Sequence, residues 1–198
     1  MHPARKYPKG EAKREAIIDA ARELVDQRGW NAVTIRELAA KVGLGTTTVT
    51  HHIGSKDELL IELLRRRDRP HDRDWDGRDP DEGLRTMLTG LEENRRVSGL
   101  RELYIRLSAE ATTPEHTAHE FFADRFRQLE AVGTRVFTEL RDTGRIPQDA
   151  DPATIATMVV ALIDGLELQS FFRPEIDVVT QIRAFLQLLL GTETTGPQ

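Results

Sequence analysis

Residues 33–60 of the chain read VTIRELAAKVGLGTTTVTHHIGSKDELL. In this stretch, Thr34 and Glu37 have the spacing of a capping box, in which both side chains satisfy amide groups left free at a helix start. Apolar residues then recur three and four positions apart up to Gly43, whose backbone freedom suits a tight turn. A second short helix is expected from about residue 45 to residue 53. The stretch therefore predicts a helix-turn-helix over residues 34–53.

The second of these helices has an unusual composition. Val49 and Ile53 are spaced to anchor it to a core, but its other positions hold four threonines, a glycine and two histidines. Each threonine costs up to about 0.7 kcal/mol relative to alanine in a helix interior. That cost is understandable if the exposed face presents hydroxyl and methyl groups to the major groove of DNA, where threonine contacts bases and phosphates. The plainer alternative is a capped surface helix that binds nothing.

The rest of the chain also favours helices. Residues 11–28 carry an apolar stripe that ends at Gly29, and Ser55 to Glu58 form a second capping box. After a break at residues 65–79, a capping residue followed by proline predicts three further helix starts, at Asp79-Pro80, Thr113-Pro114 and Asp151-Pro152. Two more starts are expected near residues 98 and 175–177. No stretch alternates with a period of two, so an all-α fold of about nine helices is predicted.

Composition narrows the possible functions. The chain has 198 residues and no cysteine, which excludes disulfides and thiol nucleophiles and suits a reducing cytoplasm. No apolar run approaches the roughly 18–20 uninterrupted residues of a membrane span, so no membrane partner is expected.

The charge of the chain is distributed unevenly. Residues 1–69 hold 14 Lys and Arg against 10 Asp and Glu, a charge of +4. Residues 70–198 hold 14 Lys and Arg against 23 Asp and Glu, a charge of −9. This asymmetry is expected if only the N-terminal part contacts a polyanion, although chance scatter of surface charge also produces it.

The motif over residues 33–60, with its spacing preserved through two helices and the next cap, resembles the TetR family of bacterial transcriptional regulators. The resemblance is dense over residues 11–64, and beyond them it is one of layout. It implies an N-terminal three-helix DNA-binding domain and a helical C-terminal domain for ligand binding and dimerisation. The expected division is a basic arm at 1–10, the DNA-binding domain at 11–66, a linker at 67–79, the C-terminal domain at 80–191 and a tail at 192–198.

The resemblance also implies which residues contact DNA. The helix expected at about residues 45–53 is the family's recognition helix and supplies most of them. Lys56 contacts phosphate at the start of the next helix. Members commonly have tyrosine where Thr50 and His52 stand, so a phosphate contact is lost or is supplied by His51 or by Arg5, Lys6 and Lys9 of the arm. The expected DNA-binding residues are Thr34, Arg36, Gly45, Thr46, Thr47, Thr48, Thr50, His51 and Lys56.

The last two expected helices are apolar on more than one face, so each must be buried on more than one face. A two-fold four-helix interface between two copies of the chain satisfies this, and two central core helices of a monomer also do. Helix-turn-helix proteins normally read paired half-sites, which favours the dimer. The expected interface residues are Ile155, Val159, Leu162, Ile163, Leu166, Ile182, Phe185, Leu186 and Leu189.

Apolar stripes also mark the helices expected from residue 80 to about residue 130. The resemblance implies a cavity there for a small apolar or amphipathic effector, although stripes of this kind are more often plain core. The expected pocket residues are Met87, Leu91, Tyr104, Leu107, Phe122, Phe126 and Gln169.

The remaining alternatives are weaker. His116 and His119 are spaced like half of a zinc site but lack further ligands at a readable distance, so no metal or other cofactor is expected. No glycine-rich phosphate loop or Ser–His–Asp pattern supports an enzyme. The sequence thus predicts a homodimeric, DNA-binding regulator, a repressor released from a palindromic operator by a small molecule. A DNA-binding protein that responds to a partner, or to no ligand, remains the alternative.

Overall fold

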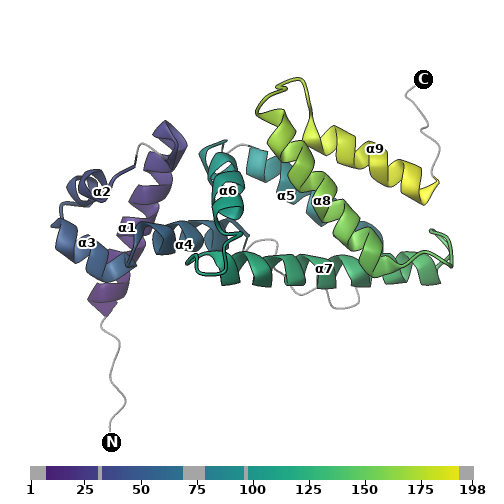
Figure 1. Ribbon diagram of the computed structural model, residues 1–198, viewed down its shortest axis with the longest axis horizontal. Helices are drawn as coiled ribbons and strands as arrows, with labels where there is room; N and C mark the ends of the chain where they lie inside the picture. Colours follow the sequence, from purple (N-terminus) through teal and green to yellow (C-terminus); the bar gives the residue numbers. More distant parts are fainter. Residues whose placement is uncertain (1–7, 31–32, 69–78, 96–97, 192–198) are drawn as a thin grey trace, which may run out of the picture. The chain divides into compact units, whose positions relative to one another are not determined.

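A computed structural model describes residues 8–30, 33–68, 79–95 and 98–191 of the chain (Figure 1). Over these residues the chain forms helices and no strand, which confirms the predicted all-α fold. Residues 1–7 of the expected arm, 69–78 of the expected linker and the expected tail lie outside the described residues. The helices are α1 (Pro8–Arg28), α2 (Ile35–Val42), α3 (Thr46–Ile53), α4 (Lys56–Asp68), α5 (Pro80–Arg95), α6 (Ser98–Glu110), α7 (His119–Asp142), α8 (Pro152–Ser170) and α9 (Val178–Leu190).

The chain divides into two compact units that do not follow the order of the sequence. The first unit joins residues 1–70 to residues 97–121, and the second joins residues 71–96 to residues 122–198. The boundary falls inside α7, after Phe121. Helix α6 thus groups with the N-terminal helices and not with the helices that follow it. The expected domain organisation, with a linker at residues 67–79, remains a proposal.

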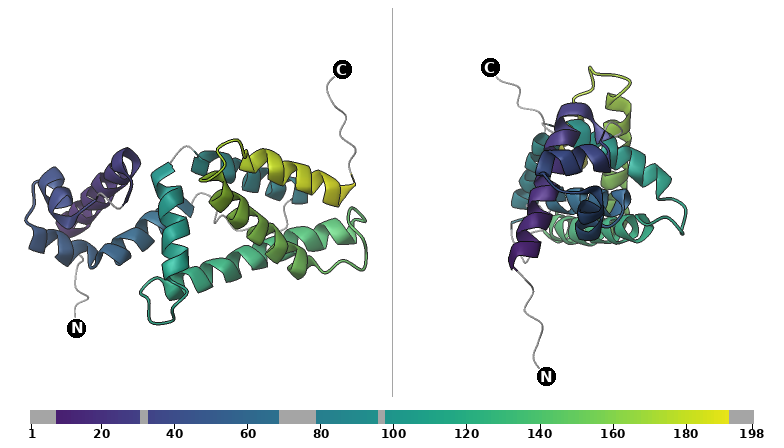
Figure 2. Two further views of the ribbon diagram at one scale, coloured as in Figure 1. Left: turned by 45° about the horizontal axis from the view of Figure 1, so that its top comes forward. Right: turned by 90° about the vertical axis from the view of Figure 1, so that its left-hand side faces the viewer.

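The first unit is built around α1 and α4. The short helices α2 and α3 lie against α1 (Figures 1 and 2), and α4 packs on both α1 and α3. The inward stripe of α1 is fully buried, as its periodicity predicted, and α4 is buried on most of its circumference. The most deeply buried side chains of these four helices are Ile17, Ile18, Val25, Leu38, Val49, Leu59 and Leu64.

Helix α6 completes the first unit by packing on α1 and α4. Leu100, Leu103 and Leu107 are buried along its inner face. Gly99 makes this close approach possible, because a Cβ atom there would lie 2.3 Å from the carbonyl oxygen of Val25. Only a residue without a side chain lets the first turn of α6 meet the backbone of α1 at this distance.

Replacing Gly99 by alanine is expected to destabilise the protein. The new methyl group meets backbone, which cannot move aside, so the cost should lie near the upper end of the roughly 1–3 kcal/mol typical of overpacking. The better helix propensity of alanine returns at most about 1 kcal/mol. Urea denaturation measures the change. Gly10→Ala in α1, where a Cβ meets nothing within 4 Å, is the matched control and should not be destabilised. Equal stability of the two variants would contradict the close approach.

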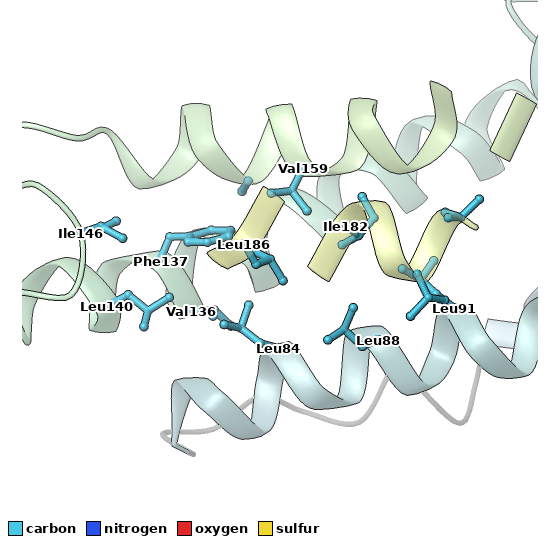
Figure 3. Packing of buried hydrophobic residues seen from close by; sticks show 13 residues of the cluster. Leu84, Leu88, Leu91, Val136, Phe137, Leu140, Ile146, Val159, Ile182 and Leu186 are labelled. Carbon is cyan, nitrogen blue, oxygen red and sulfur yellow. The ribbon is translucent and has the colours of Figure 1, made fainter. Parts of the chain in front are cut away.

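The second unit has a core between α5, the C-terminal part of α7, α8 and α9 (Figure 3). Leu84, Leu88 and Leu91 project from α5 toward α9, and Val136 and Phe137 reach the same space from α7. The two helix starts predicted in this unit from a cap followed by proline are confirmed, because Asp79 and Asp151 accept hydrogen bonds from the backbone of Asp81 and Thr154. The start expected near residues 175–177 is also found, where Asp177 accepts from the backbone of Thr180.

One predicted helix start is wrong. Thr113-Pro114 does not begin α7, because residues 111–118 form a series of turns and the helix begins at His119. Ala111 and Ala118 are buried in the first unit. The His119 Nδ1 donates to the carbonyl oxygen of Ala111 at 2.9 Å, which holds the turns together. The burial of these small residues and this hydrogen bond outweigh the local capping signal.

Candidate nucleic-acid interface

The start of α2 has the predicted capping box. The hydroxyl of Thr34 accepts a hydrogen bond from the backbone of Glu37 at 3.2 Å, and the Glu37 carboxylate accepts one from the backbone of Thr34 at 3.1 Å. Two ion pairs attach α2 to α1, Arg28 with Glu37 at 3.1 Å and Lys41 with Glu23 at 2.9 Å. These contacts fix the orientation of α2, from which Thr34 and Arg36 are exposed.

The turn between α2 and α3 depends on Gly43. Its φ of 66° lies in the left-handed region that favours glycine, and its backbone amide closes the C-terminus of α2. Gly45 then begins α3 without any side-chain hydrogen bond to the first amides of that helix. The first turn of α3 therefore keeps amide donors that no side chain of its own cap occupies.

Helix α3 has one buried and one exposed face. Val49 and Ile53 are buried against the other helices of the unit, as predicted. Thr46, Thr47 and His51 are exposed, and Thr48 is half-buried. A helix anchored along one side by two apolar residues presents the opposite side in a fixed orientation. That side carries hydroxyl, methyl and imidazole groups.

Thr50 differs from its neighbours in how its hydroxyl is used. It donates a hydrogen bond to the carbonyl oxygen of Thr46 at 3.0 Å, within the same helix. The hydroxyl therefore has no hydrogen left to donate to a phosphate, and the methyl group remains the main outward chemistry of this position.

The start of α4 is fixed by the second predicted capping box. Ser55 accepts from the backbone of Glu58 at 3.1 Å, and Glu58 accepts from the backbone of Ser55 at 2.6 Å. Gly54 precedes it with φ 72° and ψ −136°, a conformation suited to glycine. These contacts hold the backbone of Lys56, the first residue of α4, in a defined position.

Sequence reasoning did not identify Trp30 as part of this surface. The ammonium nitrogen of Lys56 lies 4.4 Å from the centre of the Trp30 ring. In the sequence, the only indication was that this aromatic residue directly follows Gly29, the glycine that ends α1. It does not by itself indicate which cation the ring contacts, because the two residues are 26 positions apart.

The arginine run at the end of α4 is used within the first unit. Arg66 pairs with Glu62 of its own helix at 3.1 Å and with Glu15 of α1 at 2.6 Å. Arg65 lies over the ring of Phe121, and Arg67 lies over the ring of Tyr104. The run therefore joins α4 to the other elements of its unit.

The expected pocket residues are distributed over both units. Tyr104 and Leu107 are buried on α6 in the first unit. In the second unit, Met87 packs against the core cluster, Leu91 and Phe122 are buried, Phe126 is 38% exposed and Gln169 is exposed. The rings of Phe122 and Phe126 are 6.3 Å apart. The pocket stays a prediction.

The expected interface residues are not equally open to a partner. Val159, Ile182 and Leu186 are buried in the core of their own unit, and the others are partly buried against it: Ile155, Leu162, Ile163, Leu166, Phe185 and Leu189. The large apolar side chains of α8 and α9 that remain exposed are Met158, Leu168 and Leu188, with Leu188 83% exposed. By length and composition alone α8 would also suffice to cross a membrane. An apolar helix that packs against a second copy of the chain has the same composition.

The two histidines that are spaced like half of a zinc site, His116 and His119, have structural roles. The His116 Nδ1 accepts from the backbone of Ala118 at 3.1 Å, and His119 donates to Ala111. Within the described ranges, no group of three or more His, Cys, Asp or Glu residues is placed to hold a metal ion.

Known proteins match both parts of the chain. The profile of the family described as "Bacterial regulatory proteins, tetR family" matches residues 17–63, and that of "BetI-type transcriptional repressor, C-terminal" matches residues 80–192. A relative named as the HTH-type transcriptional regulator BetI of Rhizobium meliloti is 27% identical over 175 residues, which cover 79% of this chain and 77% of the relative. The class D tetracycline repressor protein of Escherichia coli is 40% identical over 57 residues, covering 27% of this chain and 26% of the repressor.

The fold matches solved structures as well. The chain superposes with a TM-score of 0.72 and 25% identity on SmeT, described as the repressor of the Stenotrophomonas maltophilia multidrug efflux pump SmeDEF, over 92% of this chain and 90% of SmeT. These relatives are named as transcriptional regulators or repressors, which agrees with the predicted class of function. From its helix-turn-helix to its C-terminal helices, the chain belongs to the TetR family of DNA-binding transcriptional regulators.

Proposed function

We propose that the protein is a homodimeric repressor that binds a palindromic operator through α3 and is released by a small molecule. The observation that carries this proposal is the face of α3. Its inner side is locked by Val49 and Ile53, while its outer side consists of short polar side chains that suit the major groove. On this proposal the protein acts on nucleoid DNA in the bacterial cytoplasm.

The proposed contacts divide into base contacts and phosphate contacts. Thr46, Thr47 and Thr48 face bases, with His51 at bases or backbone. Thr34 and Lys56, at the starts of α2 and α4, contact phosphates. The backbone amides in the first turn of α3, directly after Gly45, do the same. Arg36 and Thr50 complete the surface, Thr50 through its methyl group because its hydroxyl has no hydrogen left to donate.

The exposed large apolar side chains of α8 and α9 support the dimer. Two copies that bury Met158, Leu168 and Leu188 against each other would form a four-helix interface. A two-fold arrangement would present two α3 helices to half-sites about 34–36 Å apart on a palindrome.

The proposed effector binds among the residues expected for the pocket. A ligand releases DNA only if it binds more tightly to the conformation that binds DNA poorly. A coupling of about 1–3 kcal/mol would weaken operator binding by roughly 5–150-fold. Screening apolar and amphipathic compounds for this loss tests the proposal, and a screen without hits would favour control by a partner.

Two substitutions in α3 test sequence-specific binding, once the operator has been selected from random DNA. Thr47→Ala should weaken operator binding by about 1–3 kcal/mol, because a base contact is lost, and should change binding to random DNA little. Thr50→Val is the matched control and should bind like the wild type, because the lost hydroxyl bonds only its own helix. Fluorescence anisotropy measures both affinities. An equal loss of affinity for operator and random DNA would indicate that Thr47 contacts a phosphate and not a base.

A further inference from the structure

The ring of Trp30 and the ammonium group of Lys56 form a cation–π pair at the proposed DNA-binding surface. The nitrogen lies 4.4 Å from the ring centre, well within the roughly 6 Å at which the ring's quadrupole attracts a cation. Trp30 follows α1 and Lys56 begins α4, so the pair joins two elements that are distant in the sequence.

Trp30 is rigidly held. Gly29 ends α1 with a φ of 74°, which turns the chain so that the next residue points into the unit. Trp30 is only 9% exposed, and its carbonyl oxygen accepts a hydrogen bond from the backbone of Val33 at 3.0 Å. A large ring packed in this way is a fixed platform for the lysine.

Lys56 differs from two other cations of the first unit. Lys41 and Arg28 are paired with carboxylates of the same unit. For Lys56, no ion pair with a carboxylate is found among the described residues. A carboxylate would neutralise the ammonium group and occupy its donors, whereas an aromatic face holds it and leaves both its charge and N–H groups available.

We propose that Trp30 is a positioning residue that holds the Lys56 ammonium group ready to contact a DNA phosphate. This inference rests on the proposed function of Lys56. A lysine side chain has four rotatable bonds and loses considerable rotamer entropy when its end is fixed. The Trp30 ring restricts that freedom before DNA arrives, so less is lost on binding. Backbone phosphates are the same in every sequence, so the effect should not depend on sequence.

A double-mutant cycle tests the proposal on the full-length protein. Trp30→Leu keeps an apolar side chain but removes the ring, and should weaken binding to operator and random DNA alike by about two- to fivefold. The slope of log K against log salt should not change, because Lys56 keeps its charge. Lys56→Ala should lower that slope by about one. In the Lys56→Ala background, Trp30→Leu should have no further effect.

Trp30→Phe provides the conservative comparison and should fall between wild type and Trp30→Leu, because phenylalanine keeps a weaker π face. An additive cycle, in which Trp30→Leu weakens binding as much without Lys56 as with it, would overturn the proposal. That result would mean that Trp30 only supports the fold of the unit.

A spectroscopic measurement keeps the test independent of the stability of Trp30 variants. The chain has two tryptophans, so in a Trp75→Phe background the emission comes from Trp30 alone. Lys56→Met should alter this emission without DNA, and should remove the change that operator DNA causes. Identical spectra with and without Lys56 would contradict the contact itself. Failure of all variants, wild type included, to bind DNA would instead refute the proposed function.

Discussion

Replacing Leu188 by glutamate is expected to give a folded monomer that has lost most of its operator affinity. Leu188 is 83% exposed in the single chain, so the new charge costs little in a monomer. In the proposed dimer the charge would be buried without a partner, which costs several kcal/mol. Because paired half-sites gain about 10²–10⁴-fold from simultaneous binding, separation of the two copies should weaken operator binding by a similar factor.

Sedimentation equilibrium measures whether the Leu188→Glu protein is a monomer, and thermal unfolding measures whether it is folded. Two further variants of α9 serve as comparisons. Leu188→Met keeps an apolar side chain and should remain dimeric. Leu186→Glu should instead unfold the protein, because Leu186 is 5% exposed and lies in the core of the second unit (Figure 3). A Leu188→Glu protein that stays dimeric would place the interface away from this face of α9.

Replacing Arg66 by methionine is expected to destabilise the first unit strongly at neutral pH. Arg66 connects the carboxylates of Glu62, Glu15 and Asp19, and Glu62 is 9% exposed. Removing one partner of a buried ion pair costs about 3–5 kcal/mol when the remaining charge is uncompensated. Glu62 retains Arg14 at 3.4 Å, so we expect about 2–3 kcal/mol in urea denaturation.

The destabilisation should also depend on pH. Burial alone would raise the pKa of Glu62, but hydrogen bonds from Arg66 and Arg14 outweigh it and hold the pKa below its ordinary 4.5. A carboxylate with a lowered pKa stabilises the folded state above that ordinary value, and this stabilisation is lost as the pH falls. The difference between wild type and Arg66→Met should therefore be full at about pH 7 and shrink at about pH 4.

Arg65→Met is the matched control for this experiment. Arg65 is on the same helix but is exposed, and it lies 5.7 Å from the centre of the Phe121 ring rather than beside a buried carboxylate. Its loss should cost at most about 1 kcal/mol, with no step in stability near the pKa of Glu62. Equal effects of the two substitutions would indicate that only the loss of charge matters.

The local signals in the sequence predicted most of the helices and the local backbone geometry of the proposed DNA-binding surface. The capping boxes at Thr34 and Ser55 and the turn at Gly43 involve only residues close together in the chain. Such hydrogen bonds form wherever the chain folds locally, so spacing alone identifies them. The motif also indicated the family, since it extends through two helices and the next cap.

The sequence could not indicate which distant residues meet. The pairing of Trp30 with Lys56 and the packing of α6 on α1 at Gly99 depend on contacts between segments far apart in the chain. The helix start predicted at Thr113 was wrong for the same reason, because buried alanines and a histidine hydrogen bond outweighed a local cap, and α7 begins at His119 instead.

By itself the sequence determined most of the helices and their caps and the helix-turn-helix, because these depend on neighbours within about four residues. Only the tertiary structure decided which apolar residues of α9 are core and which are uncovered. Leu186 and Leu188 are chemically identical and two positions apart, but a helix turns about 200° over that interval. Packing against α5 and α8 buries Leu186 and leaves Leu188 exposed.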